Sequence, residues 1–194
     1  MKIAKEESAK AIKTHKNATG KTAKRSTPIL KEGVVKVKPE LTKDLRDFFE
    51  DGLKDIYWVE KALIKAMTKM FKNTTSMQLI KVFKEHLKET EEHVTRLKQI
   101  FESLGLILVA KKCDAMAGLL NEANRIMEET EFGNVRDAAM IGAVQRVEQY
   151  KIDTYGTLRV YAVTIGKTKA VLILSKTLSE AKNANAKLTE IAVS

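Results

Sequence analysis

Between residues 41 and 194, apolar side chains recur every three or four positions, and this spacing constrains the fold more than any other feature. The clearest stripe runs from Leu45 to Phe71. A repeat near 3.6 residues is that of an amphipathic α-helix with one buried face. We therefore predict an all-α protein. Helices are expected over about residues 43–72, 77–104, 114–130, 135–165 and 169–191.

Helix start and stop signals separate these stretches. Thr42 is a plausible N-cap of the first helix and Asp114 of the third, because short polar side chains bond the free N–H groups there. The turn residues 73–76 end the first helix, and Gly105 ends the second. Two long helices, a crossover and a further pair predict an antiparallel four-helix bundle with a fifth, C-terminal helix.

The first forty residues have a different composition. They contain eleven Lys and Arg, four acidic residues, both prolines (Pro28 and Pro39) and no aromatic residue. Such a segment buries too little apolar area to offset its ordering entropy. We predict a disordered basic N-terminal tail over 1–40 and a helical domain over 41–194. The tail is either a solubilising segment or an arm attracted to nucleic acid or another polyanion.

Several classes of protein are excluded by simple counts. The single cysteine, Cys113, rules out an intrachain disulfide framework. No apolar run approaches the ~18 residues needed to span a membrane, and residues 1–40 lack the apolar segment of a secretory signal. We therefore expect no membrane partner.

Polar residues interrupt the buried stripes at matching depths. Each of the first four predicted helices carries one glutamate beside apolar neighbours, and two histidines flank the glutamate of the second helix. These residues are Glu60, Glu89, Glu122, Glu148, His86 and His93. Burying four carboxylates without compensation is costly, so either cations pair with them or protons neutralise some.

Metal ions are one solution. Carboxylate oxygen and imidazole nitrogen suit iron or manganese, and bundle interiors place such ligands on facing helices. Glu60 and Glu148 would be terminal ligands, Glu89 and Glu122 the bridges, and His86 or His93 the nitrogen donor. The alternative is a purely structural polar layer in the core.

Four segments, in order and spacing, resemble the YciE/YciF family of ferritin-like proteins. The His-Leu-x-Glu-Thr sequence of the second helix and the Tyr-Gly after the glutamate of the fourth are the most distinctive. The segments are 57–63 (YWVEKAL), 83–90 (FKEHLKET), 113–119 (CDAMAGL) with Glu122, and 147–150 (VEQY) with 155–158 (YGTL).

The resemblance covers about residue 41 to the C-terminus. It implies a ferritin-like bundle with a carboxylate-bridged pair of iron ions, usually in a bacterial, cytoplasmic, stress-associated homodimer. It also implies a ferroxidase, or an oxidoreductase that consumes peroxide, with manganese as another metal. Tyr57 and Tyr155 would then donate hydrogen bonds or electrons near the metals, although core packing explains both equally well.

The sequence departs in two places from the ferritin-like pattern, which has Glu-x-x-His on both the second and the fourth helix. On the second helix, Glu92 stands three residues after Glu89, and the histidines lie three residues before Glu89 and four after it. Three residues after Glu148 stands Lys151, where relatives more often have a carboxylate. A protonated lysine cannot be a metal ligand, but it can pair with Glu148 or occupy the place of the second ion. The alternative prediction is therefore a bundle with one metal or none, which acts as a structural or interaction protein and associates with nucleic acid through its tail.

Overall fold

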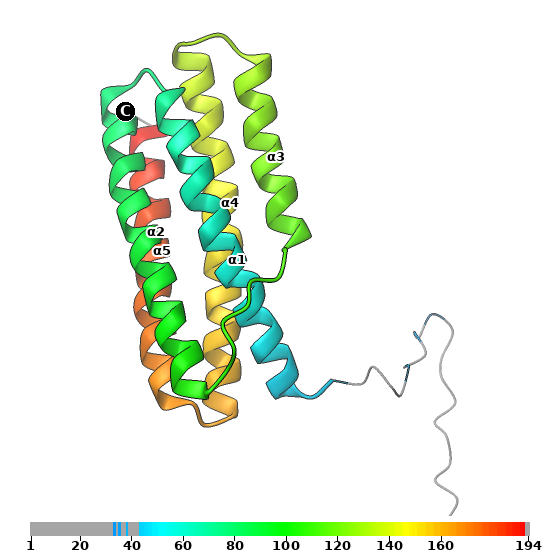
Figure 1. Ribbon diagram of the computed structural model, residues 1–194. Helices are drawn as coiled ribbons and strands as arrows, with labels where there is room; N and C mark the ends of the chain where they lie inside the picture. The colour runs from blue at the N-terminus through cyan, green and yellow to red at the C-terminus, as the bar shows by residue number, and fades with distance from the viewer. Residues whose placement is uncertain (1–32, 34, 36–37, 39–42, 193–194) are drawn as a thin grey trace, which may run out of the picture. The chain divides into compact units, whose positions relative to one another are not determined.

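The structure is a computed structural model that describes residues 33, 35, 38 and 43–192. Five helices account for nearly all of the range 43–192, as Figure 1 shows. They are α1 (Leu45–Lys72), α2 (Met77–Leu104), α3 (Asp114–Glu129), α4 (Asn134–Thr164) and α5 (Thr168–Ala192). No strand occurs within the described ranges, and the all-α prediction is confirmed.

Four of the helices form one bundle. Short turns join α1 to α2 and α4 to α5, so each pair is antiparallel, and each helix also packs on a member of the other pair: α2 on α5 and α1 on α4. The crossover from α2 to α4 contains α3, which lies outside this core and packs mainly on α4. This is the architecture of a ferritin-like helical bundle.

The structure refines which helix is the additional one. The C-terminal helix α5 is a full member of the four-helix core, where Leu174, Ala181 and Leu188 are buried. The short helix α3 is peripheral and buries only Met116, Ala123 and Met127. Its 16 residues span about 24 Å, too short to run the length of its neighbours, so it covers the side of the bundle instead.

The ends of the helices follow local chemistry. Asp44 and Asp47 form a capping box at the start of α1, so Asp44 and not the predicted Thr42 is the N-cap residue. Cys113, rather than Asp114, is the N-cap residue of α3, and its thiol accepts from the backbone N–H of Met116. Gly105 ends α2 in the left-handed conformation (φ 66°), as predicted.

Two predictions fall outside the described residues. One concerns Thr42, the predicted N-cap, and the other concerns the basic tail over 1–40, of which nearly all residues are outside the described ranges. The described residues 43–192 belong to one compact unit. None of the described helices is long and apolar enough to cross a membrane.

Candidate buried charge centre

A fully buried lysine lies between two fully buried glutamates in the middle of the bundle. The Nζ atom of Lys151 is 3.3 Å from Glu148 Oε1 and 3.4 Å from Glu60 Oε2, and all three side chains are 0% exposed. Lys151 and Glu148 are one turn apart on α4, whereas Glu60 comes from α1. The ion pair between Lys151 and Glu148 that the sequence suggested is therefore present.

Two histidines of α2 also contact the carboxylates of Glu148 and Glu60. His86 Nε2–H donates a hydrogen bond to Glu148 Oε1 at 2.8 Å. His93 Nδ1 lies 3.3 Å from Glu60 Oε1. The two histidines are seven residues apart, or two helical turns, so both face the interior and each meets a different glutamate.

Helix α5 contributes a carboxylate that the sequence interpretation missed. Glu180 accepts a hydrogen bond from His93 Nε2–H at 3.0 Å, and Arg96 Nη2 donates to its other oxygen at 2.9 Å. Glu180 lies next to buried Ala181 and three residues after buried Thr177. The buried face of α5 is hard to recognise in the sequence near Glu180, because alanine and threonine give a weaker apolar signal than leucine.

The two predicted tyrosines have different surroundings. Tyr155, which is fully buried, donates a hydrogen bond from its hydroxyl to Glu60 Oε1 at 2.7 Å. Tyr57 is also buried, but its ring packs against Phe101 with centroids 5.9 Å apart. Only Tyr155 therefore joins the charged centre, and Tyr57 contributes to core packing.

The structure does not bring Glu122 to this centre, which corrects the expectation that it bridges two metals. Glu122 lies on the peripheral helix α3, and its carboxylate accepts two hydrogen bonds from Arg146 at 2.9 and 3.2 Å. Because α3 is outside the core, its apolar stripe faces α4 and leaves Glu122 at the rim. Glu89 is intermediate: it is partly exposed, 3.7 Å from His86 Nδ1.

Cationic neighbours keep the buried carboxylates ionised. Burial alone would raise the pKa of Glu60, but the positive charge of Lys151, with His93 and the hydroxyl of Tyr155, lowers it to about 2. Burial likewise opposes ionisation of Glu148, whereas His86 and Lys151 lower its pKa below the ordinary value. Both glutamates are therefore negatively charged at neutral pH.

The carboxylates in turn shift the pKa values of Lys151 and Tyr155. Burial alone would lower the pKa of Lys151, but Glu148 and Glu60 raise it above its ordinary value. Burial and the nearby carboxylate of Glu60 raise the pKa of Tyr155 well above its usual range. At neutral pH, Lys151 is thus an internal cation and Tyr155 is a neutral donor.

The buried donor groups have features for and against the two-metal centre that the resemblance implies. In favour, Glu60 Oε2, Glu148 Oε2 and the Nδ1 atoms of both histidines are buried without a hydrogen-bond partner. Against it, the ammonium of Lys151 lies within 3.4 Å of both terminal carboxylates, where a bridging cation would sit. A pair of divalent ions about 3.5–4 Å apart would also have to share this volume with a third positive charge. The residues therefore do not fit two metal ions while Lys151 is charged.

Within the residues that the structure describes, no group of three or more His, Cys, Asp or Glu side chains has a spacing suited to a metal ion. The carboxylates of Glu60, Glu148 and Glu180 instead contact basic side chains of α2 and α4. The centre is a network of alternating acids and bases, and each charge has an opposite neighbour.

The fold and this centre together define a ferritin-like helical bundle with a charged, hydrogen-bonded core. Residues 44–194 match the family described as "Domain of unknown function (DUF892)", and the chain belongs to that family. The match begins at the N-cap residue of α1 and excludes the basic N-terminal segment.

Relatives of known structure agree with the assignment. The chain is 41% identical over 152 residues to Protein YciF of Escherichia coli K12, which covers 78% of this chain and 92% of YciF. The crystal structure of that stress protein superposes with a TM-score of 0.76 at 42% identity, covering 78% of this chain and 96% of YciF. YcfI of Rhodopseudomonas palustris superposes with a TM-score of 0.75 at 35% identity, covering 79% and 98%.

A protein of Xanthomonas campestris shares the fold at 20% identity, with a TM-score of 0.62 and coverage of 76% and 90%. The resemblance to the YciE/YciF family that the sequence motifs carried is therefore confirmed. The similarity spans most of YciF itself, so the shared unit is the whole helical bundle.

Proposed function

We propose that this protein is a YciF-like bundle that works without a two-metal centre, as a structural or interaction protein. The observation that carries the proposal is the position of Lys151, whose ammonium is paired with both Glu60 and Glu148 in the fully buried core. An internal lysine supplies the countercharge that metal ions would supply in a ferritin-like oxidase. The related YcfI, described as "a putative structural protein", is consistent with such a role.

Charge balance supports the same conclusion. The four acids of the network, Glu60, Glu89, Glu148 and Glu180, face the side chains of Lys151, Arg96, His86 and His93. Lys151, Arg96 and protonated His86 offset three of these four negative charges, which leaves little net negative charge to attract divalent cations. The bundle then keeps a rigid, specific core through paired charges rather than through metal ligands.

The decisive experiment is metal content per chain by elemental analysis, after anaerobic loading with Fe(II) and, separately, with Mn(II). We expect well below one ion per chain for the wild type. Lys151→Glu should bind more metal, because it removes the internal cation and adds a carboxylate. The exposed Lys169→Glu makes the same charge change on α5 and should leave metal binding as in the wild type. Circular dichroism would show whether each variant remains helical.

A second candidate is the iron- or manganese-dependent oxidase that the family resemblance implies, acting on Fe(II) or peroxide. The buried oxygens and imidazole nitrogens without hydrogen-bond partners favour it. Two ions per wild-type chain, lost in Glu60→Gln/Glu148→Gln, would establish this candidate and overturn the metal-independent one. One ion per chain, retained in Lys151→Gln, would point to a single metal held by the histidines.

Three further features stay predictions: a homodimer, a cytoplasmic location and attraction of the N-terminal segment to nucleic acid. Sedimentation at micromolar concentration tests the dimer, and fractionation of the source cells tests the location. For the third, deletion of residues 1–40 should abolish retention on DNA at low salt, because the attraction is electrostatic.

A further inference from the structure

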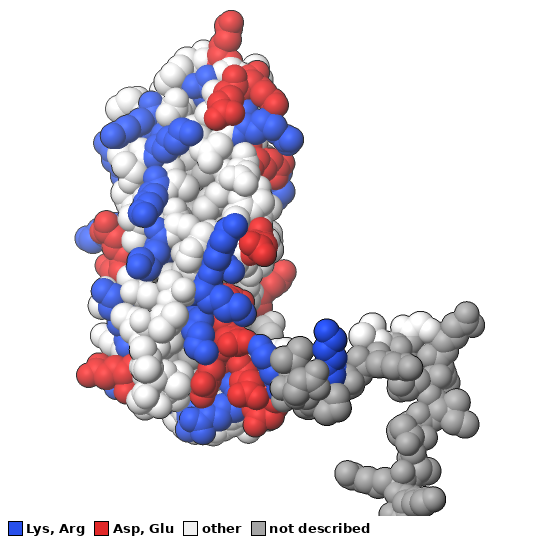
Figure 2. Space-filling view, turned by 45° about the vertical axis from the view of Figure 1, so that its right-hand side comes forward, with Lys and Arg blue, Asp and Glu red and all other residues white. Residues whose placement is uncertain are grey.

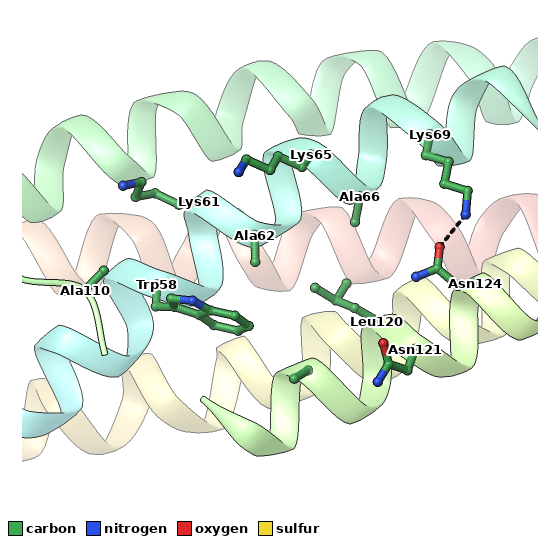
Figure 3. A pocket seen from close by; sticks show the side chains of 11 residues that line it. Trp58, Lys61, Ala62, Lys65, Ala66, Lys69, Ala110, Leu120, Asn121 and Asn124 are labelled. Carbon is green, nitrogen blue, oxygen red and sulfur yellow. Dashed lines mark hydrogen bonds between the residues drawn. The ribbon is translucent and has the colours of Figure 1, made fainter. Parts of the chain in front are cut away.

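A surface groove of the bundle lies between α1 and the peripheral helix α3. Its volume is about 660 Å³. Ala110, in the crossover before α3, also lines it. In Figure 3, Trp58, Ala62 and Ala66 of α1 lie on the side toward Leu120 of α3, and Lys69 reaches Asn124. The groove exists because α3 packs mainly on α4 and leaves the neighbouring face of α1 uncovered.

The floor of the groove is apolar and built from small residues. Ala62 and Ala66 line it from α1 and Ala117 from α3, and the larger Trp58 and Leu120 extend into it (Figure 3). Alanine side chains let another backbone approach closely, and interhelical distances of about 8–10 Å need such small contacts. The shape therefore suits a helix lying along the groove.

One rim of the groove is strictly basic. Lys61, Lys65 and Lys69 line it, whereas no Asp or Glu is among its lining residues. Lys69 donates a hydrogen bond to Asn124 across the groove at 2.8 Å. In the described part of the chain, none of the three lysines lies within ion-pair distance of a carboxylate, in contrast to Lys54 and Lys111 nearby. Figure 2 shows this face, where basic side chains border a hollowed, uncharged stretch of the surface.

The spacing of the lysines matches that of acidic residues at every fourth position of another helix. They are four residues apart, so their positions advance about 6 Å per step along α1. Carboxylates four residues apart on a second helix advance by the same 6 Å, and each is then opposite one lysine. A single small anion uses only one of the three charges, and a single-stranded nucleic acid needs stacking surfaces that this groove offers only at Trp58.

We propose that the α1–α3 groove is a docking site for an amphipathic helix of another protein, with an apolar face and glutamate or aspartate residues at every fourth position. Such helix-in-groove recognition uses apolar anchors for affinity and the charged rim for register. The groove shares no residue with the Lys151 centre, and its test reads peptide binding rather than metal content, so this inference can fail independently of the proposed function.

Trp58 is the only tryptophan of the chain and lies in the groove, so its fluorescence reports occupancy. The probe is a synthetic Leu/Ala/Glu peptide of about 16 residues, because shorter helices are marginal in water. We expect saturable binding to the full-length protein at low salt that weakens as salt screens the charges. A peptide with every Glu replaced by Lys should not bind, and a scrambled peptide of the same composition should bind at least about tenfold more weakly.

Two variants test the two halves of the site. Lys61→Glu/Lys65→Glu should lower the affinity at least about tenfold, since like charges then face each other. The control Lys98→Glu/Lys169→Glu makes the same change in net charge on α2 and α5 and should leave the affinity unchanged. Ala66→Phe keeps every charge but fills the floor, and it should also abolish binding.

The proposal is overturned by any of three results. These are unchanged binding to Ala66→Phe, equal binding of the scrambled peptide, and preference for a single-stranded oligonucleotide over the peptide in the same fluorescence titration. Dimerisation of the protein that hides Trp58 would likewise assign the groove to a second copy. Because the metal-loading experiment reads a different site, its outcome leaves this test unaffected.

Discussion

The Nζ atom of Lys151 lies 3.4 Å from Glu60 Oε2, although the two residues belong to different helices and neither side chain is exposed. A buried charge without a partner is far less stable than one in water. This pair, completed by Glu148, therefore determines how the core responds to substitution and to pH.

Removing the lysine should destabilise the protein strongly. Lys151→Met leaves two buried carboxylates without their shared cation, and we expect a loss of about 3–5 kcal/mol in the free energy of unfolding. Urea denaturation measures this, and the exposed Lys169→Met should change stability by less than about 0.5 kcal/mol. Adding Glu60→Gln and Glu148→Gln to Lys151→Met should recover most of the loss. No recovery would mean that lysine acts through packing rather than charge.

The stability should fall in acid through Glu60. Its pKa is about 2 in the folded protein against 4.5 for an ordinary glutamate, so ionised Glu60 stabilises the folded state above pH 4.5. This contribution, about 3 kcal/mol, is lost as the pH falls from 4.5 toward 2. In Glu60→Gln, urea unfolding should depend less on pH over that range. An acid slope as steep as that of the wild type would contradict the assignment.

Stability should also decline at the alkaline side through His86. The carboxylate of Glu148 raises the pKa of this histidine above 6.5 against the effect of burial. Protonated His86 therefore stabilises the folded state fully below pH 6.5, and the contribution is lost as the pH rises through the raised pKa. The pH titration of the His86 imidazole by NMR should have its midpoint at a higher pH than that of a histidine in a short peptide. A midpoint below 6.5 would show that desolvation dominates.

The turn between α1 and α2 depends on a side chain from α4. Buried Asp137 accepts hydrogen bonds from the backbone N–H groups of Thr75 and Ser76 at 3.0 and 2.7 Å, and from the Thr75 hydroxyl at 2.7 Å. Asp137→Ala leaves these donors without partners, and we expect a loss of about 3 kcal/mol. Asp153→Ala, exposed on the same helix, is the control in thermal unfolding. A similar small effect of both substitutions would show that water replaces the carboxylate.

Two glycines should respond in opposite directions to the same substitution. Gly105 has φ of 66°, which an alanine adopts at a penalty of about 1 kcal/mol, so Gly105→Ala should destabilise. Gly118 lies inside α3, where an added Cβ meets no atom within 4 Å, so Gly118→Ala should stabilise by about 0.5–1 kcal/mol. Chemical denaturation of both variants decides this. Shifts of the same sign would contradict the local conformations.

The sequence alone predicted the helices well because their stripes are long and regular. Glu60, His86, His93 and Glu148 were also placed inside, since each interrupts a run of large apolar residues. Glu122 satisfied the same pattern and lies at the rim. A stripe shows only that a helix has an apolar face and not which neighbour covers it.

Apolar stripes in the sequence do not reveal that Glu180 is the partner of His93. Glu180 stands among alanines and threonine, and only the packing of α5 against α2 reveals its role. The function of Lys151 was half visible: its spacing from Glu148 predicted an ion pair within α4. The contact with Glu60 required knowledge of the relative rotation of α1 and α4, which local patterns do not contain.

The contacts of the charged centre join residues that are far apart along the chain. Tyr155 and Glu60 are separated by 95 residues, and His93 and Glu180 by 87. During synthesis, α1 and α2 leave the ribosome before Glu148, Lys151 and Glu180 have been made, so Glu60, His86 and His93 each lack at least one of their charged partners. Until α4 and α5 emerge, these charges remain hydrated and keep the first hairpin from collapsing around them. The same groups that fix the finished core thus delay its closure until almost the entire chain has been made.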